Sequence, residues 1–176
     1  MSAHERPVGA TVEWYTPPEF FDRLPLKFDL DPAAGRNDAE TGARSSVPSR
    51  YFYNAEDDGL SREWHGRVWL NPPYGPVLPK FVDRMCRHRL GLMLVPSRTE
   101  TAWWQKAVRS ADMVVFLRDR LHFVRGYDGY QARASFASCL FVWGLTECRA
   151  VDRADLGWWA PGDAGRTGAR LTEVSA

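Results

Sequence analysis

An apolar run leads directly into a proline-rich turn in the stretch Val68-Trp69-Leu70-Asn71-Pro72-Pro73-Tyr74-Gly75. Residues 68–70 are apolar without a break, which is typical of a strand that is buried on both faces of a sheet. The two prolines end that strand, because neither can donate a hydrogen bond to a neighbouring strand. Strands buried on both faces occur mainly in parallel sheets that helices cover. The stretch therefore favours an α/β fold, with Asn71 and Tyr74 directly after a buried strand.

Other apolar runs alternate with helical patterns on both sides of this stretch. The expected strands are residues 27–31, 67–71, 90–95, 113–117 and 135–143. The expected helices are residues 17–24, 79–88 and 101–109. This alternation predicts a mostly parallel sheet with helices on both faces. The last two strands have no helical pattern between them, so we expect a C-terminal antiparallel hairpin at one edge. Ligands of such sheets bind at the carboxyl ends of the strands.

Length and composition indicate one domain. The 176 residues can form a single large core, and we expect the domain at residues 11–160 with mobile tails at 1–10 and 161–176. No apolar run approaches the ~20 residues that span a membrane, and residues 1–10 lack the hydrophobic stretch of a secretory signal. The three cysteines show no pairing pattern and the histidines no ligand pattern, which predicts a cytoplasmic protein without a metal. With a net charge of +1, nucleic-acid binding would require a local basic patch.

The segment Asn71-Pro72-Pro73-Tyr74 carries groups that suit the chemistry of an exocyclic amine on a nucleobase. Such an amine is a poor nucleophile, because its lone pair is delocalised into the ring. The Asn71 side-chain oxygen and the Pro72 carbonyl could accept its two hydrogens and favour a pyramidal nitrogen with an exposed lone pair. Tyr74 could stack on a base that is flipped out of the duplex. An ordinary proline turn after a strand is the alternative interpretation of the same residues.

Six segments resemble, in order, the phage-type DNA N6-adenine methyltransferases of the Dam group. They are E-W-Y-T-P-P-E-F-F-D-R-L (13–24), F-D-L-D-P-A-A (28–34), D-G-L-S-R-E-W (58–64), V-W-L-N-P-P-Y-G (68–75), L-V-P-S-R-T-E-T-A-W-W (94–104) and R-L-H-F (120–123). Amino-methyltransferases in general share the Asn-Pro-Pro-Tyr motif, whereas W-x-T-P and F-D-L-D-P-A-A make the match more specific. The resemblance implies a Rossmann-like class I methyltransferase domain with S-adenosyl-L-methionine as cofactor.

The resemblance also implies which residues hold the cofactor. Asp31 matches the acidic residue that meets the methionine ammonium, and Thr16 matches the residue that holds the methionine carboxylate. Asp57 and Asp58 are candidates for the ribose hydroxyls or the adenine amine, and we choose Asp58. The full set expected at the cofactor is Trp14, Thr16, Pro17, Asp31, Pro32, Ala33, Asp58 and Asn71. From the residues alone, Asp31 or Thr16 could instead cap a helix, and Asp57-Asp58 could form an acidic surface turn.

Arginines are the expected contacts to DNA. Arg98 follows the strand expected at residues 90–95, and Arg120 lies among further arginines beside His122 and Phe123. Such a patch could bind phosphates while the aromatic rings stack, so we predict that Arg98 and Arg120 contact DNA. Residues 76–150 are expected to belong mostly to the catalytic sheet, which leaves sequence readout to loops at 97–101 and 118–134.

These observations predict an enzyme that transfers a methyl group to N6 of adenine in DNA, with no membrane partner. Methylation of cytosine N4 is an alternative, because that amine needs the same two acceptors. RNA and a protein glutamine are further possible substrates. A non-catalytic nucleic-acid-binding module is the alternative from another class, and the intact motif from Asn71 to Tyr74 argues against it, as does Asp31. The sequence favours no particular oligomeric state.

Overall fold

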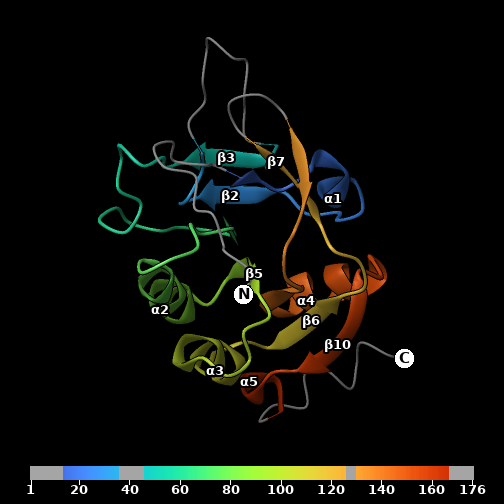
Figure 1. Ribbon diagram of the computed structural model, residues 1–176. Coiled ribbons are helices and arrows are strands. Elements are labelled where there is room, and N and C mark those ends of the chain that lie inside the picture. Colours follow the sequence, from blue (N-terminus) through green and yellow to red (C-terminus); the bar gives the residue numbers. More distant parts are fainter. Residues whose placement is uncertain (1–13, 36–45, 126–129, 167–176) are drawn as a thin grey trace, which may run out of the picture.

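A seven-stranded sheet forms the centre of this computed structural model, which describes residues 14–35, 46–125 and 130–166 (Figure 1). The strands lie in the order β10-β6-β9-β5-β4-β2-β3. Their bounds are β2 Phe28–Asp31, β3 Ser49–Phe52, β4 Val68–Leu70, β5 Gly91–Pro96, β6 Met113–Leu117, β9 Ser138–Trp143 and β10 Gly157–Pro161. All five strands expected from the apolar runs are present. The α/β character is therefore confirmed.

The sheet is mixed rather than mostly parallel. Its β3, β2, β4 and β5 strands pair in parallel, whereas β9 pairs antiparallel with both β5 and β6, and β10 antiparallel with β6. The expected antiparallel pairing of the runs at 113–117 and 135–143 is present as β6 and β9. The expectation that these strands form the edge is wrong, because β9 lies inside the sheet and β10 forms that edge. All six residues of β9 are buried, which requires neighbours on both sides.

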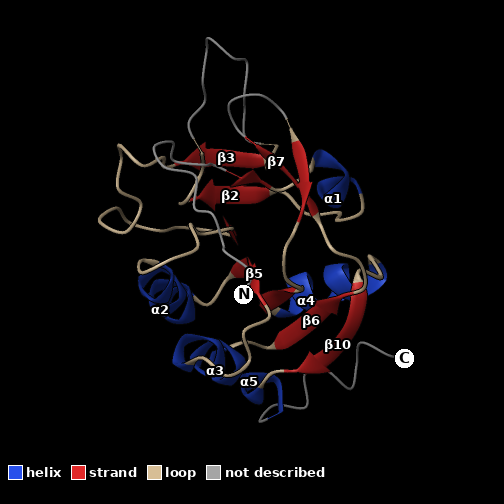
Figure 2. Cartoon of the chain, in the orientation of Figure 1, coloured by secondary structure: helices blue, strands red, loops and turns tan. Residues whose placement is uncertain are grey.

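Helices cover both faces of the sheet (Figure 2). On one face, α2 (Leu78–His88) and α3 (Ala102–Ser110) pack over a core cluster that contains residues of β4, β5 and β9. On the other face, α1 (Pro18–Asp22) and α4 (Leu145–Arg153) pack over a second cluster. In α2, Phe81, Val82 and Met85 recur at helical spacing on one face, and all three side chains are buried. A short helix, α5 (Asp163–Arg166), follows β10.

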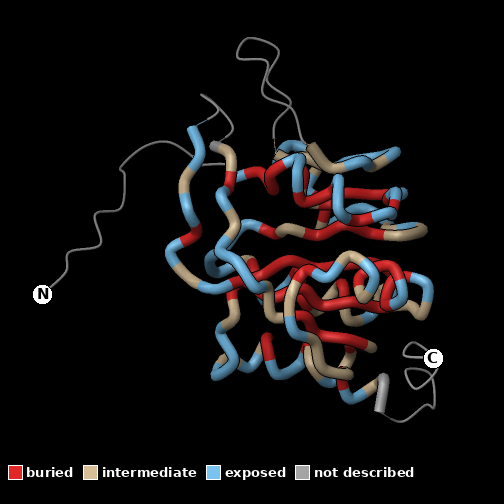
Figure 3. The backbone as a smooth tube through the Cα atoms, turned by 90° about the vertical axis from the view of Figure 1, so that its right-hand side faces the viewer, coloured by how far each residue is buried: buried red, intermediate tan, exposed pale blue. Residues whose placement is uncertain are grey.

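Burial follows the strands through the middle of the molecule (Figure 3). In β5, Leu92 and Leu94 belong to one core cluster, whereas Met93 and Val95 belong to the other. Successive side chains of a strand point to opposite faces, so a continuous apolar run serves both clusters at once. This explains why the central strands were recognisable from runs of apolar residues.

A separate three-stranded sheet stands beside the main one. Its order is β1-β7-β8, with β1 at Trp14–Tyr15, β7 at His122–Arg125 and β8 at Gln131–Arg133. All its pairings are antiparallel. The segment between β6 and β9 is thus not a set of loops on the catalytic sheet, as expected, but contains a hairpin that joins the N-terminal strand. These strands are only two to four residues long, and β7 and β8 mix polar with apolar residues, which left no apolar run to recognise.

The described chain continues beyond residue 160, because β10 ends at Pro161 and α5 ends at Arg166. Of the expected tails at residues 1–10 and 161–176, residues 161–166 contain the end of β10 and α5, whereas residues 1–10 and 167–176 lie outside the described residues. Within the ranges that the structure describes, no helix has the length and apolar character needed to cross a membrane.

Candidate active site

The carboxyl ends of β2 and β4 lie side by side at the point where the order of the strands reverses, because β3 pairs with one edge of β2 and β4 pairs with the other. From β2 the chain passes to β3 on one side and later to β4 on the other, and both strands pair with β2 in parallel. Connections that leave in opposite directions open a crevice, which is where α/β sheets bind ligands. A cavity of about 720 Å³ lies here, and both Asp31 and Asn71 line it.

Asp31 is a buried carboxylate at the end of β2, with 4% of its surface exposed. Its Oδ1 accepts a hydrogen bond of 3.1 Å from the backbone N–H of Ala33. Burial raises the pKa of this carboxyl to about 7, although the Ala33 N–H acts in the opposite direction. No described Lys, Arg or His side chain forms an ion pair with it. A cationic group of a ligand would supply the missing partner.

The turn after Asp31 allows other backbone segments to come close. Residues 32–35 form no helix, so Asp31 caps none there. A Cβ atom added at Gly59 would lie 1.9 Å from the Pro32 carbonyl oxygen, and one at Gly35 would lie 1.8 Å from a ring carbon of Tyr15. Glycine is required where backbones approach this closely. Pro32 and Ala33 thus line a narrow part of the cavity wall.

The Asn71 side chain connects β4 to the N-terminal strand. Its Nδ2 donates to the Trp14 carbonyl and to the Thr16 hydroxyl oxygen, each at 3.4 Å. Its Oδ1 accepts from the Tyr74 hydroxyl at 3.2 Å. The amide is therefore held from both ends. Its oxygen faces the same part of the cavity as the tyrosine.

Pro72, Pro73 and Tyr74 continue the wall after Asn71. Pro72 is buried, and no described residue donates a hydrogen bond to its carbonyl. Tyr74 is 40% exposed, and its ring centroid lies 5.9 Å from that of Phe136 at an interplanar angle of 57°. A half-exposed ring beside the Pro72 carbonyl and the Asn71 oxygen, which keeps one lone pair available, is a suitable surface for a planar ligand with an amino group.

The small sheet covers the other side of the cavity. Trp14 and Thr16 line it from β1 and the residue after it, and Phe123 lines it from β7. Thr16 is buried, with 2% of its surface exposed. Pro17 does not line the cavity. It has an extended backbone at the N-cap of α1, and its carbonyl accepts from the Phe20 N–H at 3.1 Å.

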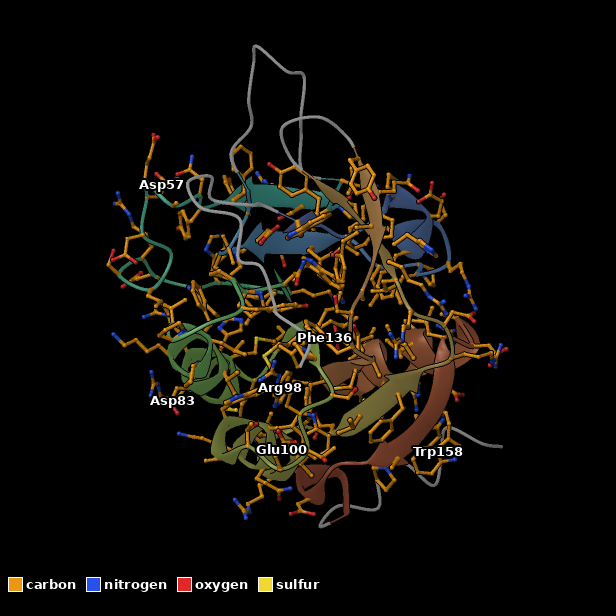
Figure 4. All side chains as sticks on the ribbon, in the orientation of Figure 1. Asp57, Asp83, Arg98, Glu100, Phe136 and Trp158 are labelled. Atoms are coloured by element: carbon orange, nitrogen blue, oxygen red, sulfur yellow. The ribbon has the colours of Figure 1, made fainter. Side chains whose placement is uncertain are left out.

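The two neighbouring aspartates have different environments. Asp58 lines the cavity, whereas the Asp57 carboxylate accepts a 3.0 Å hydrogen bond from the Asn54 N–H. Figure 4 shows Asp57 at the outer side of its loop. Asp58 has a positive φ of 51°, a conformation that Asp tolerates better than most residues. The choice of Asp58 over Asp57 therefore agrees with its position on the cavity wall.

Comparison with known proteins identifies the family. The family model for DNA N-6-adenine-methyltransferase (Dam) matches residues 5–151. The chain belongs to the Dam family. A DNA N-6-adenine-methyltransferase of Haemophilus phage HP1 (strain HP1c1) is 30% identical over 111 residues, which cover 59% of each chain. One of Escherichia phage T1 is 30% identical over 112 residues, covering 59% of this chain and 44% of the relative. The chain thus spans about three fifths or less of these curated relatives, and no solved structure matches it.

Family membership confirms the resemblance that the sequence motifs indicated. In this Dam-family chain, three motif segments that are distant in sequence lie around one cavity: Trp14 and Thr16, Asp31 to Ala33, and Asn71 to Tyr74. Of the residues expected at the cofactor, only Pro17 lies outside the cavity wall. The described residues contain no group of three or more His, Cys, Asp or Glu side chains that could hold a metal ion.

The two arginines expected to contact DNA lie outside the cavity wall. The Arg98 guanidinium lies 5.8 Å from the ring centroid of Phe136, which does line the cavity (Figure 4). The Arg120 Nη1 donates to the carbonyls of Ala134 and Ser135, at 3.4 Å and 3.2 Å. Arg118, which is close in sequence, pairs instead with Asp155 at 2.8 Å. Both expected residues therefore adjoin the segment that carries Phe136.

Several residues of the cavity wall were not assigned to it from the sequence, and one of them, Phe123, was predicted instead to stack beside the arginines expected at the DNA. Phe136 lies between β8 and β9, Phe123 lies in β7, and Gly59 follows the acidic turn. Trp69 contributes from within β4, and its buried indole N–H has no hydrogen-bond partner among the residues that the structure describes. An aromatic residue within a short polar strand has no distinguishing pattern. Only the pairing of β7 with β1 brings that region to the cavity.

Proposed function

We propose that this Dam-family protein transfers a methyl group from S-adenosyl-L-methionine to N6 of adenine in DNA. The observation that carries the proposal is a pair of acceptors after β4, beside a cavity with the buried Asp31 carboxylate. The pair consists of the Asn71 Oδ1 and the Pro72 carbonyl, to which no described residue donates. The names of the phage relatives support adenine as the target. We further propose a Rossmann-like class I domain, supported by the switch point at β2 and β4 and by the reversed strand β9 between β5 and β6.

The cavity fits the proposed cofactor in size and in charge. A volume of about 720 Å³ lies within the usual range for cofactor pockets. Asp31 is buried without a described cation, so the methionine ammonium would form a charge-assisted pair with it. The residues proposed to hold the cofactor are Trp14, Thr16, Asp31, Pro32, Ala33, Asp58 and Asn71, with Pro17 setting the backbone that follows Thr16. When bound, the cofactor supplies an activated methyl group on a sulfonium.

The chain's own residues would prepare the amine. Asn71 and Pro72 each accept one amine hydrogen, which keeps the nitrogen lone pair out of conjugation with the base. Pro73 keeps the backbone extended, so that the Pro72 carbonyl stays directed toward the site. Tyr74 stacks on the extruded base and holds it in the plane that these two acceptors require. The Asn71 oxygen has two lone pairs, so it can accept from the amine while it still accepts from the Tyr74 hydroxyl.

DNA would bind across the side of the cavity where Arg98 and Arg120 lie. Arg98 is exposed and stacks on Phe136, so its guanidinium can contact a phosphate near the extruded base. Arg120 is also exposed, and only its Nη1 is engaged with carbonyls. Its remaining N–H groups can bind a phosphate.

The test is incubation of unmethylated DNA with labelled S-adenosyl-L-methionine, followed by mass spectrometry of the nucleosides. We expect N6-methyladenine from the wild-type protein and none from Asn71→Ala. Asn71→Ala should still bind the cofactor, because Asn71 is one of seven residues proposed to hold it and its main task is to accept from the target amine. Label in N4-methylcytosine alone would refute adenine as the target. Cofactor binding without any transfer would favour a non-catalytic module.

A further inference from the structure

The orientation of the Asn71 amide is dictated by the N-terminal strand. A backbone carbonyl can only accept hydrogen bonds, so the group facing the Trp14 carbonyl at 3.4 Å must be the amide nitrogen. The opposite end of the amide is then the oxygen, which accepts from Tyr74 at 3.2 Å. A reversed amide would direct N–H groups at the substrate, and these cannot accept the hydrogens of an amine.

Thr16 is the second residue that holds this nitrogen, and it retains an unused proton. Its oxygen accepts from Asn71 Nδ2 at 3.4 Å. Only 2% of the residue is exposed, and it lines the cavity. A hydroxyl can donate one hydrogen bond while it accepts others. No residue in the described ranges accepts from the Thr16 hydroxyl. A buried donor in a cavity wall calls for an acceptor from a ligand.

We propose that Thr16 is a positioning residue that couples cofactor binding to the orientation of Asn71. The hydroxyl proton bonds an anionic oxygen of the cofactor, while the same oxygen holds the Asn71 amide. Donation to an anion polarises the hydroxyl and strengthens it as an acceptor, so a bound cofactor fixes the amide more firmly. The inference rests on the proposed function for the identity of the cofactor.

The coupling assigns an order to events in the site. Before the cofactor binds, the Asn71 oxygen is paired with Tyr74, and the amide nitrogen is held by two bonds of 3.4 Å, which is long for a hydrogen bond. After the cofactor binds, the nitrogen is held more tightly, so the oxygen stays directed toward the cavity, where its second lone pair can accept from the target amine. Thr16 acts on the amine only through Asn71, so its loss should lower kcat and not only weaken cofactor binding.

The experiment compares Thr16→Val, which keeps the shape and removes the hydroxyl, with Thr16→Ser, which keeps the hydroxyl. Methyl transfer is measured at saturating cofactor, so that weaker binding does not lower the rate. We expect Thr16→Val to lower kcat by about tenfold, in line with the loss of one hydrogen bond of ordinary strength. Thr16→Ser should restore most of this loss. Thr146→Val is the control, because Thr146 is exposed in α4, which follows the other end of β9.

A second measurement needs no cofactor and no turnover. The side-chain NH₂ signals of Asn71 in a ¹⁵N-labelled protein report its hydrogen bonds, and Asn71→Ala assigns them by their loss. We expect Thr16→Val to shift these signals, and Thr16→Ser to leave them near the wild-type positions. Adding S-adenosyl-L-methionine should shift them in the wild type and in Thr16→Ser, but much less in Thr16→Val. Thr16→Ala serves as the second variant if Thr16→Val does not fold.

The outcomes separate this inference from the proposed function. Wild-type NH₂ signals and a wild-type kcat in Thr16→Val would overturn the coupling, even if the protein methylates adenine. Failure of the wild type to transfer methyl groups would overturn the proposed function. In that case the NMR signals still test whether Thr16 holds Asn71. A loss of kcat that Thr16→Ser does not restore would also contradict the inference.

Discussion

Replacement of Asp31 by Asn should have opposite effects on cofactor binding and on the stability of the free protein. The carboxyl has a pKa of about 7, raised from its ordinary value of 3.8 by burial. Between these two pH values the folded protein holds a proton that the unfolded chain releases, so stability falls as the pH rises through this window. The shift of roughly 3 pH units corresponds to at most about 4 kcal/mol of destabilisation above pH 7. Asp31→Asn removes this cost and should raise the melting temperature at pH 8.

Binding of the proposed cofactor should respond in the other direction. An ammonium pairs only with the ionised carboxylate, so wild-type affinity should rise with pH up to about 7 and then level off. With a pKa near 7, about 1% of the carboxyl is ionised at pH 5, which predicts affinity lower by up to about 100-fold than at pH 8. Asp31→Asn should bind about 10- to 100-fold more weakly at pH 8 through loss of a charge-assisted pair, and with little pH dependence.

Titration calorimetry from pH 5 to pH 8, with thermal unfolding at the same pH values, measures both effects. Asp57→Asn is the matched control, because Asp57 does not line the cavity and an asparagine side-chain oxygen can still accept from the Asn54 N–H. It should leave cofactor affinity and its pH dependence unchanged. Equal wild-type affinity at pH 5 and pH 8 would refute the reasoning. So would a variant that loses both cofactor binding and thermal stability at pH 8.

Three further predictions concern the base, the DNA and the fold. Tyr74→Phe should keep most of the activity, whereas Tyr74→Ala should lose about 10- to 100-fold, because stacking on a base contributes ~1–3 kcal/mol. Steady-state kinetics on one DNA substrate compares them, and equal rates would exclude a stacking role. Arg120→Ala should weaken DNA binding and reduce its salt slope by about 1, without changing cofactor affinity, and Arg118→Ala is the control. A wild-type slope in titrations at several salt concentrations would argue against a phosphate contact. Glu147→Ala should lower the unfolding free energy by about 3 kcal/mol, because it leaves Arg67 without its partner at 2.6 Å. Urea unfolding measures this, and a loss below about 0.5 kcal/mol would contradict it.

The chain's apolar pattern predicted the central strands, and it failed where other forces decide the structure. The run at 113–117 coincides with β6, because a strand covered on both faces must be apolar throughout. The edge strand β3 was missed, because its residues Tyr51 and Phe52 are exposed and it has no buried run. The helix α4 was missed because its buried face includes the charged residue Glu147, which interrupts the apolar pattern. The ion pair with Arg67 stabilises this buried charge.

The sequence by itself determined which polar groups lie at the ends of β2 and β4, and hence the chemistry that we propose for the site. Local pattern was enough to name the motif from Asn71 to Tyr74 and the aspartate that ends β2. In both places a proline ends the strand, so the last residues lie at the carboxyl edge of the sheet, where ligands bind. Tertiary structure alone decided what surrounds them. Thr16 lies 55 residues from Asn71 in the chain, and Phe136 comes from a linker after an unrecognised hairpin. Contacts between residues so far apart in sequence depend on how the strands pair. The free energy of strand pairing comes from many residues, so no single segment reveals it.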